Sequence, residues 1–302
     1  MLSLKAPAKI NWILRVGSKR DDGYHEIQSL IQKVSLYDEL SFALSERVTL
    51  DTEAPVSTGE NLVYRAAILL KEAYGVESGA SITLKKNIPI GAGLGGGSSD
   101  AAAALIGLNE LWSLGLTVIQ LSKTGAKLGS DVPFFLFDSM SYVSGRGEKV
   151  SARSAVRPVD ILLVNPLLKV STTWVYERFA AQSVSIDKGT NDTESLRPGS
   201  NPSELTKKAE KVNNIEHFIR NIERAELLEI ADSVSNDLES VTIKSFPVVA
   251  EIKEKLVRQG AVVSLMSGSG PTVFAVFESQ EKAQEASRYF SDCWTAVVQT
   301  II

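Results

Sequence analysis

A run of glycines that leads directly into a run of alanines is the feature that most constrains this chain. Residues 88–100 read IPIGAGLGGGSSD, and residues 101–105 read AAAAL. Glycine has no Cβ, so backbone N–H groups in such a run can approach an anion and adopt positive φ angles. Ser98, Ser99 or Asp100 can cap the alanine-rich helix, whose positive dipole end faces the same anion. We therefore predict that the start of this helix binds the phosphates of a nucleotide.

The surroundings of the run argue against other glycine-rich motifs. Gly91, Gly93 and Gly96 match the dinucleotide-binding pattern, but Glu110, near the offset of the ribose-binding acid, lies in a helical pattern instead of at a strand end. The Gly-Lys-Ser/Thr of a P-loop is missing, and so are the downstream motifs of protein kinases. A plain flexible turn remains as the alternative. An ordinary turn does not need so many glycines, and each of them loses more conformational entropy on folding than another residue would.

Composition describes a globular protein without a strong charge bias. The chain has 302 residues, which is enough for two domains, and 44% of them are hydrophobic. A formal net charge of −4 gives no electrostatic case for a nucleic-acid or membrane surface. Cys293 is the only cysteine and the histidines are His25 and His217, so we expect no disulfide framework and no His/Cys metal site. With no signal-peptide pattern and no apolar run of membrane length, we expect a cytoplasmic protein.

Strand and helix patterns are mixed along the chain and predict an α+β fold in two domains, residues 1–155 and 156–302. Strand patterns cover residues 10–16, 38–42, 48–51, 81–85, 159–164, 261–265 and 272–277. Helical patterns cover residues 61–74, 101–114, 119–128, 212–222, 225–234 and 247–259. The polar composition of residues 182–203 indicates a mobile surface loop.

A lysine and an asparagine near the N-terminus form a second candidate feature. Residues 6–12 read APAKINW, and Lys9 and Asn11 share one face of the predicted strand because they lie two residues apart. This pair suits a charged, hydroxylated ligand. An exposed lysine at a strand edge is the alternative interpretation.

Two further segments carry polar groups at breaks in the backbone. In residues 128–135, LGSDVPFF, Asp131 lies between a glycine and a proline and precedes an apolar run, which predicts a carboxylate at the edge of a core. A helix-capping aspartate is the alternative there. Residues 266–272, MSGSGPT, offer backbone and hydroxyl donors for another anion, or form a simple hairpin.

In this order and at this spacing, the four segments resemble the kinases named for galactose, homoserine, mevalonate and phosphomevalonate, the GHMP kinases. The Gly-Glu-His element typical of galactokinases and mevalonate kinases is absent. Residues 7–11 (PAKIN), 20–27 (RDDGYHEI) and 36–40 (LYDEL) are similar instead to the branch that acts on a cytidine-diphosphate alcohol. The similarity runs over residues 6–175 and resumes from 236 to 277.

The resemblance implies a two-domain GHMP-kinase fold with the active site in the cleft between the domains. It implies ATP-dependent phosphorylation, with Mg²⁺, of the 2-hydroxyl of 4-diphosphocytidyl-2-C-methyl-D-erythritol in the non-mevalonate isoprenoid pathway. Another small-alcohol kinase of the family is the alternative. Lys9 and Asp131 would be the catalytic pair, with Asp131 taking the hydroxyl proton and Lys9 orienting Asp131 and offsetting charge. Phosphoryl transfer needs this positioning and charge stabilisation, and little covalent chemistry.

The resemblance also implies two sets of binding residues. Those expected to bind ATP are Asn61, Leu62, Lys86, Pro89, Gly91, Ala92, Gly93, Leu94, Gly95, Gly96, Gly97, Ser98 and Ser99, with the first three near the adenine. Those expected to bind the cytidine-diphosphate substrate are Asn11, Tyr24, His25, Ile31, Thr172 and Tyr176. Asn11 and His25 would form hydrogen bonds, and Tyr24 and Tyr176 would flank the base. Ser99 is a candidate magnesium ligand. Ile31 stands where some relatives have an aromatic ring.

Two other classes of protein remain as alternatives. A catalytically inactive sensor of a small molecule would be expected to lack Lys9 or Asp131, and both are present. A nucleic-acid-binding module is disfavoured by the acidic charge balance and the complete glycine loop. The expected partners are therefore ATP and a small-molecule substrate, with no nucleic acid and no membrane, in a monomer or weak homodimer.

Overall fold

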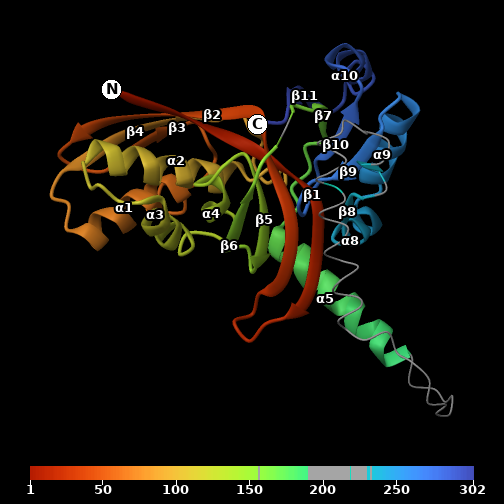
Figure 1. The fold of residues 1–302 in the computed structure, drawn as a ribbon, viewed down its shortest axis with the longest axis horizontal. Coiled ribbons are helices and arrows are strands. Elements are labelled where there is room, and N and C mark those ends of the chain that lie inside the picture. The colour runs from red at the N-terminus through yellow and green to blue at the C-terminus, as the bar shows by residue number, and fades with distance from the viewer. Residues whose placement is uncertain (156, 190–217, 219–229, 232) are drawn as a thin grey trace.

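The computed structural model describes residues 1–302 except 156, 190–217, 219–229 and 232 (Figure 1). Two sheets organise the described part of the chain. The first contains β1 (Leu2–Lys19), β2 (His25–Ser45), β3 (Thr49–Thr52), β4 (Gly79–Lys85), β5 (Met140–Gly145), β6 (Lys149–Arg153) and β8 (Ser235–Asn236). The second has the order β11-β7-β10-β9, from β7 (Asp160–Asn165), β9 (Val263–Met266), β10 (Val273–Phe277) and β11 (Trp294–Gln299).

The helices divide between the two sheets. The described helices are α1 (Leu62–Tyr74), α2 (Gly96–Leu111), α3 (Val118–Gly125), α4 (Val132–Phe135), α5 (Thr172–Gly189), α8 (Glu239–Ser245), α9 (Val248–Arg258) and α10 (Gln280–Ser287). In Figure 1, α1 to α4 lie against the first sheet, and α9 and α10 lie against the second. In the described residues we find no helix that is both long enough and apolar enough to cross a membrane. Mixed sheets with helices in two halves confirm the predicted α+β class.

The pairing of β1 with β2 forms the longest hairpin of the first sheet. Its antiparallel register runs from Leu2 opposite Phe42 to Lys19 opposite His25. The register shifts between Asn11 and Ile13, and such bulges re-aim side chains next to functional sites. β8 joins β1 in parallel, so a short segment from the second half of the chain completes the first sheet.

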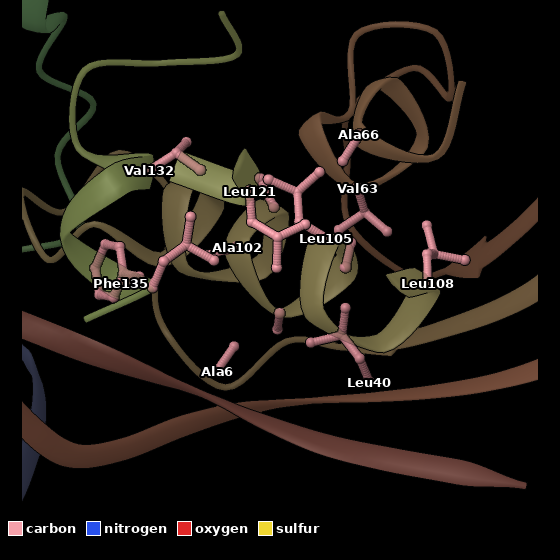
Figure 2. Packing of buried hydrophobic residues seen from close by; sticks show 14 of the residues in the cluster. Ala6, Leu40, Val63, Ala66, Ala102, Leu105, Leu108, Leu121, Val132 and Phe135 are labelled. Carbon is pink, nitrogen blue, oxygen red and sulfur yellow. The ribbon is translucent and has the colours of Figure 1, made fainter. Parts of the chain in front are cut away.

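Small side chains let α2 pack closely on the first sheet (Figure 2). Ala102 and Leu105 of α2 are buried, together with Val63 of α1 and Leu40 of β2. At Gly107 the approach is closest, because a Cβ placed there would lie 2.5 Å from the Phe42 ring. The alanine and glycine content of α2 is therefore needed for packing as well as for helix formation.

The glycine run forms a loop that enters α2 earlier than the sequence predicts. α2 starts at Gly96, and its N-cap is Gly95, with φ of 70° and no side-chain cap. The prediction that Ser98, Ser99 or Asp100 caps the helix is wrong, because a glycine at positive φ turns the chain into the helix without a side-chain oxygen. The N–H groups of the first turn, which have no partner within a helix, are left without a capping side chain.

A buried ion-pair network, which we call the loop clamp, ties the two ends of the glycine loop together. Lys86 donates to the carboxylates of Asp38 on β2 and, at 2.7 Å, Asp100 on α2. Asp38, fully buried, also accepts from the backbone N–H groups of Asn87 at 2.6 Å and Ile88 at 2.8 Å. Burial is the main cause that raises the pKa of Asp100, to about 7, while Lys86 opposes the shift.

Most of the other predicted elements are confirmed, with a few corrections. The helix predicted for residues 101–114 occupies residues 96–111. The prediction of a surface loop from Gln182 onward is wrong for residues 182–189, because α5 continues to Gly189. Residues 182–189 are mostly polar, but they form the C-terminal part of α5, and the N-terminal part of this helix is anchored in the fold by buried Val175. Residues 190–203 lie outside the described residues. So do most residues of the predicted helices 212–222 and 225–234. Of those described, Phe218, Ile230 and Ala231 are helical, whereas Ser233 and Val234 are not, so the second helix ends earlier than predicted.

Replacing Gly107 with alanine tests the packing of α2. We expect Gly107→Ala to lower the free energy of unfolding by about 1–3 kcal/mol, because the added methyl overpacks against the Phe42 ring. Gly97→Ala in the same helix is the control, since its nearest neighbour would be Leu62 Cδ1 at 3.8 Å. This control should be neutral or more stable by up to about 1 kcal/mol. Urea unfolding of both variants without ligand measures the difference, and equal effects would contradict the packing argument.

Removing Asp38 tests the loop clamp. We expect Asp38→Ala to lower the free energy of unfolding by about 3–5 kcal/mol, because it breaks a buried ion pair and leaves two N–H groups without their acceptor. The neighbouring Glu39, which forms an exposed pair with Lys85 at 3.6 Å, provides the control. Glu39→Ala should change the stability by no more than about 0.5 kcal/mol. Similar losses in both variants, measured by urea unfolding, would argue against the clamp.

Candidate active site

One cleft of about 930 Å³ brings together nearly all of the residues expected from the sequence. It lies between the β1–β2 hairpin, the glycine loop, the N-terminal end of α4, α5 and the turn between β9 and β10. Its walls include the expected residues Lys9, Asn11, Tyr24, His25, Ile31, Asn61, Leu62, Lys86, Pro89, Gly91, Ala92, Gly93, Leu94, Gly95, Gly96, Gly97, Ser98, Asp131, Thr172 and Tyr176. Ser99 is the expected residue that the cleft does not reach.

Lys9 is held by the strand and by the glycine loop. Its side chain is buried and donates to Asn11 Oδ1, and Asn11 Nδ2 donates to Ser29 Oγ at 2.8 Å. The backbone N–H of Lys9 donates to Leu94 O at 3.0 Å, so β1 is tied to the loop. Burial lowers the pKa of the Lys9 ammonium, and the charge of Asp131 opposes that shift. Lys9 is thus not the exposed edge lysine of the alternative interpretation.

Asp131 faces the cleft with an uncommitted carboxylate. It occupies the N-cap position of α4 but makes no capping hydrogen bond with its side chain. Within the described chain its carboxylate has no hydrogen-bond or ion-pair partner, although it interacts electrostatically with Lys9 and Tyr176. The capping alternative is therefore not supported. Burial, with a smaller contribution from Asp131, raises the pKa of the Tyr176 hydroxyl.

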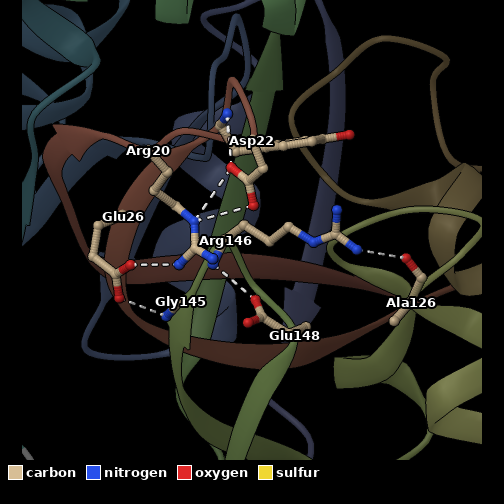
Figure 3. A network of polar contacts seen from close by, with 8 residues as sticks. Arg20, Asp22, Glu26, Ala126, Gly145, Arg146 and Glu148 are labelled. Carbon is tan, nitrogen blue, oxygen red and sulfur yellow. Dashed lines mark hydrogen bonds and ion pairs between the residues drawn. The ribbon is translucent and has the colours of Figure 1, made fainter.

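The tip of the β1–β2 hairpin is fixed by a polar network (Figure 3). Arg20 pairs with Asp22 at 3.2 Å and with Glu26 at 2.7 Å, and Glu26 accepts from the N–H of Gly145 at 3.1 Å. These contacts join the hairpin tip to the end of β5 and hold the adjacent Tyr24 at the cleft, where its side chain is 49% exposed.

Arg146 is a cleft residue that the sequence reasoning missed. Its guanidinium lies over the Tyr24 ring, 5.0 Å from the centroid, and donates to Ala126 O at 3.2 Å (Figure 3). Glycines with positive φ flank it, Gly145 at 76° and Gly147 at 126°, so the turn that presents it depends on both. The pattern Gly-Arg-Gly between two strands is the signal that could have indicated this position.

Helix α5 reaches the hairpin tip through an aromatic contact. The rings of His25 and Tyr176 lie 5.8 Å apart at 34°, and the His25 Nδ1 is 3.1 Å from Gly17 O. One turn earlier on α5, the hydroxyl of Thr172 hydrogen-bonds to Ser269 Oγ at 2.8 Å. Tyr176 and Tyr24 are therefore both placed on the cleft, at positions set by different elements.

The second glycine turn is a hairpin between β9 and β10 that packs on the first glycine loop. Ser267 Oγ donates to Gly93 O at 3.0 Å, and a Cβ on Gly93 would lie 2.2 Å from Ser267 O. Asn236 Nδ2 holds the same turn by donating to Met266 O at 2.7 Å and Gly268 O at 2.8 Å. Both halves of the chain therefore shape the cleft.

Ser99, the candidate magnesium ligand, is not among the residues that line the cleft. Its hydroxyl is buried and lacks a hydrogen-bond partner. Among the residues with a described placement, no group of three or more His, Cys, Asp or Glu side chains gathers as a metal site.

Comparison with known proteins connects this geometry to a family. The N-terminal domain model of the GHMP kinases matches residues 61–139, and their C-terminal domain model matches residues 215–296. The chain is 40% identical over its full length to the 4-diphosphocytidyl-2-C-methyl-D-erythritol kinase of Thermodesulfovibrio yellowstonii, covering 99% of that protein. The enzyme of the same name from Geobacter metallireducens is also 40% identical, with the same coverage.

Solved structures agree with the sequence matches. A 4-(cytidine 5'-diphospho)-2C-methyl-D-erythritol kinase superposes with a TM-score of 0.78 at 31% identity, over 99% of both chains. The homoserine kinase of Cytophaga hutchinsonii shares the fold, with a TM-score of 0.68 at 21% identity, over 100% of this chain and 94% of that one. This chain is therefore an enzyme of the GHMP kinase family, and within that family it belongs with the 4-diphosphocytidyl-2-C-methyl-D-erythritol kinases.

Proposed function

We propose that this kinase transfers the γ-phosphoryl group of ATP to the 2-hydroxyl of 4-diphosphocytidyl-2-C-methyl-D-erythritol. The proposal rests above all on one observation: a single cleft joins the glycine loop to the uncommitted carboxylate of Asp131 and to the aromatic side chains of the hairpin tip and α5. Full-length identity of 40% to enzymes of that name supports the choice of substrate.

The glycine loop and the start of α2 would bind the ATP phosphates. The first intrahelical bond runs from Ser99 N to Gly95 O, which leaves the N–H groups of Gly96, Gly97 and Ser98 available to an anion. The helix dipole adds partial positive charge at the same point. Asn61 caps α1 by accepting from Val63 N at 2.9 Å, and this places Asn61 and Leu62 where an adenine beside the loop would contact them.

A magnesium ion fits this site as a companion of the nucleotide. Mg²⁺ commonly keeps several waters and binds phosphate oxygens with one or two protein carboxylates, so a full protein cage is not required. The Ser99 hydroxyl does not reach the cleft, so phosphate oxygens and waters would supply most of the ligands of this ion. When bound with ATP, the ion would offset negative charge on the transferring phosphoryl group.

Lys9 and Asp131 would act on the acceptor hydroxyl. Asp131, free of other partners, would accept the proton as the hydroxyl oxygen attacks the γ-phosphorus. The Lys9 ammonium, fixed by Asn11 and by its buried stem, would orient Asp131 and stabilise the charge that develops on the phosphoryl oxygens.

The cytidine end of the acceptor would bind at the hairpin tip. Tyr24 and Tyr176 offer aromatic rings on the cleft wall, and His25, which follows Tyr24 in the chain, has its ring 5.8 Å from that of Tyr176. Its Nδ1 is close to Gly17 O, so Nε2 is the nitrogen that would bond the base. Ile31, buried on β2, and Thr172 on α5 would complete the pocket. Aliphatic packing by Ile31 would replace the aromatic ring of some relatives.

A coupled ATPase assay with a panel of alcohols tests the proposal directly. We expect turnover with 4-diphosphocytidyl-2-C-methyl-D-erythritol and little with methylerythritol phosphate, homoserine, mevalonate or galactose. Preference for another alcohol on the panel would replace the proposed substrate and leave the kinase assignment intact.

Replacing Asp131 tests its role as the base. We expect Asp131→Asn to lower kcat by about 10²- to 10⁴-fold while ATP affinity, measured by calorimetry, and stability stay close to normal. Stability is retained because the side chain makes no capping hydrogen bond. Asp51→Asn, an exposed change on β3 outside the cleft, is the control and should leave kcat unaltered. Near-normal turnover in folded Asp131→Asn would remove Asp131 from catalysis.

Removal of the Tyr24 ring tests recognition of the base. Stacking on an aromatic side chain contributes about 1–3 kcal/mol per base. Tyr24→Ala should therefore reduce kcat/KM for the cytidylated acceptor by about 5- to 150-fold without changing ATP binding. Tyr74→Ala, a surface tyrosine at the end of α1, serves as the matched control. An unchanged kcat/KM in Tyr24→Ala would mean that stacking on the Tyr24 ring does not contribute to recognition of the base.

A further inference from the structure

The one-turn helix α4 has few hydrogen bonds of its own to hold Asp131. It spans residues 132–135, too few to be stable without tertiary contacts. The N–H of Val132 reaches Gly129 O at 3.3 Å, and the N–H of Leu136 reaches Pro133 O at 3.1 Å. All four helical residues are buried, so the orientation of the helix depends on what surrounds it.

Lys33 of β2 holds the C-terminal end of this helix. Its Nζ donates to Phe137 O at 2.6 Å and Phe135 O at 3.2 Å, two carbonyls at the end where helices lack intrahelical donors. The same ammonium lies 5.7 Å from the centroid of the Phe134 ring, and the backbone N–H of Lys33 donates to Ser139 O at 2.8 Å. A cation at a helix C-terminus also interacts favourably with the helix dipole.

The position of Lys33 links it to both proposed catalytic groups. Lys33 is the cross-strand partner of Lys9 in the β1–β2 register. The Phe135 ring, whose carbonyl Lys33 holds, lies beside the glycine loop: a Cβ on Gly95 would be 2.8 Å from Phe135 Cζ and 3.0 Å from Lys9 Cγ. A shift of α4 would therefore move Asp131 relative to Lys9 and the loop.

Burying the Lys33 amine costs desolvation free energy, which an apolar side chain at the same position would not cost. Burial lowers the pKa of Lys33 to about 8, and Asp138 opposes that shift. Protonated or neutral, the amine retains at least two N–H donors for the two carbonyls.

We propose that Lys33 is a positioning residue, which acts on catalysis by fixing α4 and through it the carboxylate of Asp131. The inference rests on the proposed role of Asp131. It does not depend on which alcohol the enzyme phosphorylates. Lys33 itself is not among the residues that line the cleft.

Variants of Lys33 and of its neighbour Gln32 separate positioning from plain stability. Lys33→Met removes the donors and keeps the aliphatic stem, and Lys33→Arg keeps a cation with donors. Gln32→Met is the matched control: Gln32 is buried on the same strand, accepts from Trp12 Nε1 at 2.8 Å and donates to Ile301 O at 3.1 Å, away from α4. Each is assayed as the full chain with the alcohol that the wild type phosphorylates best.

We expect Lys33→Met to lower kcat by about 10- to 100-fold, since misplacement of a catalytic group by about 1 Å can cost about 10²-fold. The KM values for ATP and for the acceptor should stay within about threefold, because binding groups are untouched. Lys33→Arg should restore most of kcat, and Gln32→Met should lose stability but not kcat. Loss of stability without loss of kcat in Lys33→Met would reduce Lys33 to a structural residue and overturn the proposal.

A double-mutant cycle tests whether the effect passes through Asp131. On an Asp131→Asn background, Lys33→Met should cause no further loss of kcat, because the group that Lys33 positions is already gone. A full additional loss would overturn the positioning role while leaving the role of Asp131 intact. If Asp131→Asn alone kept normal turnover, both that role and this inference would fail.

Amide hydrogen exchange gives a readout that needs no substrate. Lys33→Met should exchange faster than wild type at residues 132–137, and Lys33→Arg and Gln32→Met should not. Unchanged protection of this segment in Lys33→Met would contradict the proposal. If Lys33→Met does not fold, Lys33→Gln, which is shorter and keeps donors for one carbonyl, takes its place in every measurement.

Discussion

The antiparallel pairing of β1 with β2 is the interaction on which the rest of the site depends. Its register sets Lys9 opposite Lys33 and Asn11 opposite Ile31. The same pair of strands carries the hairpin tip at one end and, near the other, Asp38, the anchor of the loop clamp. A shift of one residue in this pairing would turn every one of these side chains to the opposite face of the sheet.

The charged groups of the loop clamp and those of the proposed reacting centre differ in their partners. Lys86 pairs with both Asp38 and Asp100 in the loop clamp, and this clamp holds a segment whose glycines would otherwise leave it flexible. The Asp131 carboxylate, in contrast, has no hydrogen-bond or ion-pair partner within the described chain, and in that part of the chain the Lys9 ammonium donates a hydrogen bond only to the neutral Asn11 side chain. The clamp residues pair with one another and hold the loop, whereas the Asp131 carboxylate on the cleft wall is left to interact with a ligand.

The sequence predicted those features of the site that depend only on residues close together in the chain. The spacing of Lys9 and Asn11 placed both on one face of a strand, and both line the cleft. The glycine run predicted an anion-binding helix start, but its cap is Gly95 and not a serine, because positive φ is a property of the folded loop. Ser98 lines the cleft but Ser99 does not, since one residue along a helix turns a side chain by about 100°.

The sequence by itself determined the α+β class, the family and most of the cleft residues, because strand alternation, glycine content and motif order are properties of neighbouring residues. Only the tertiary structure decided which distant groups meet. Arg146 over Tyr24 and Lys33 at the end of α4 join segments more than 100 residues apart in the chain. Such contacts follow from sheet register and helix packing, which are set by the whole core and leave no periodic signal in the sequence around either partner.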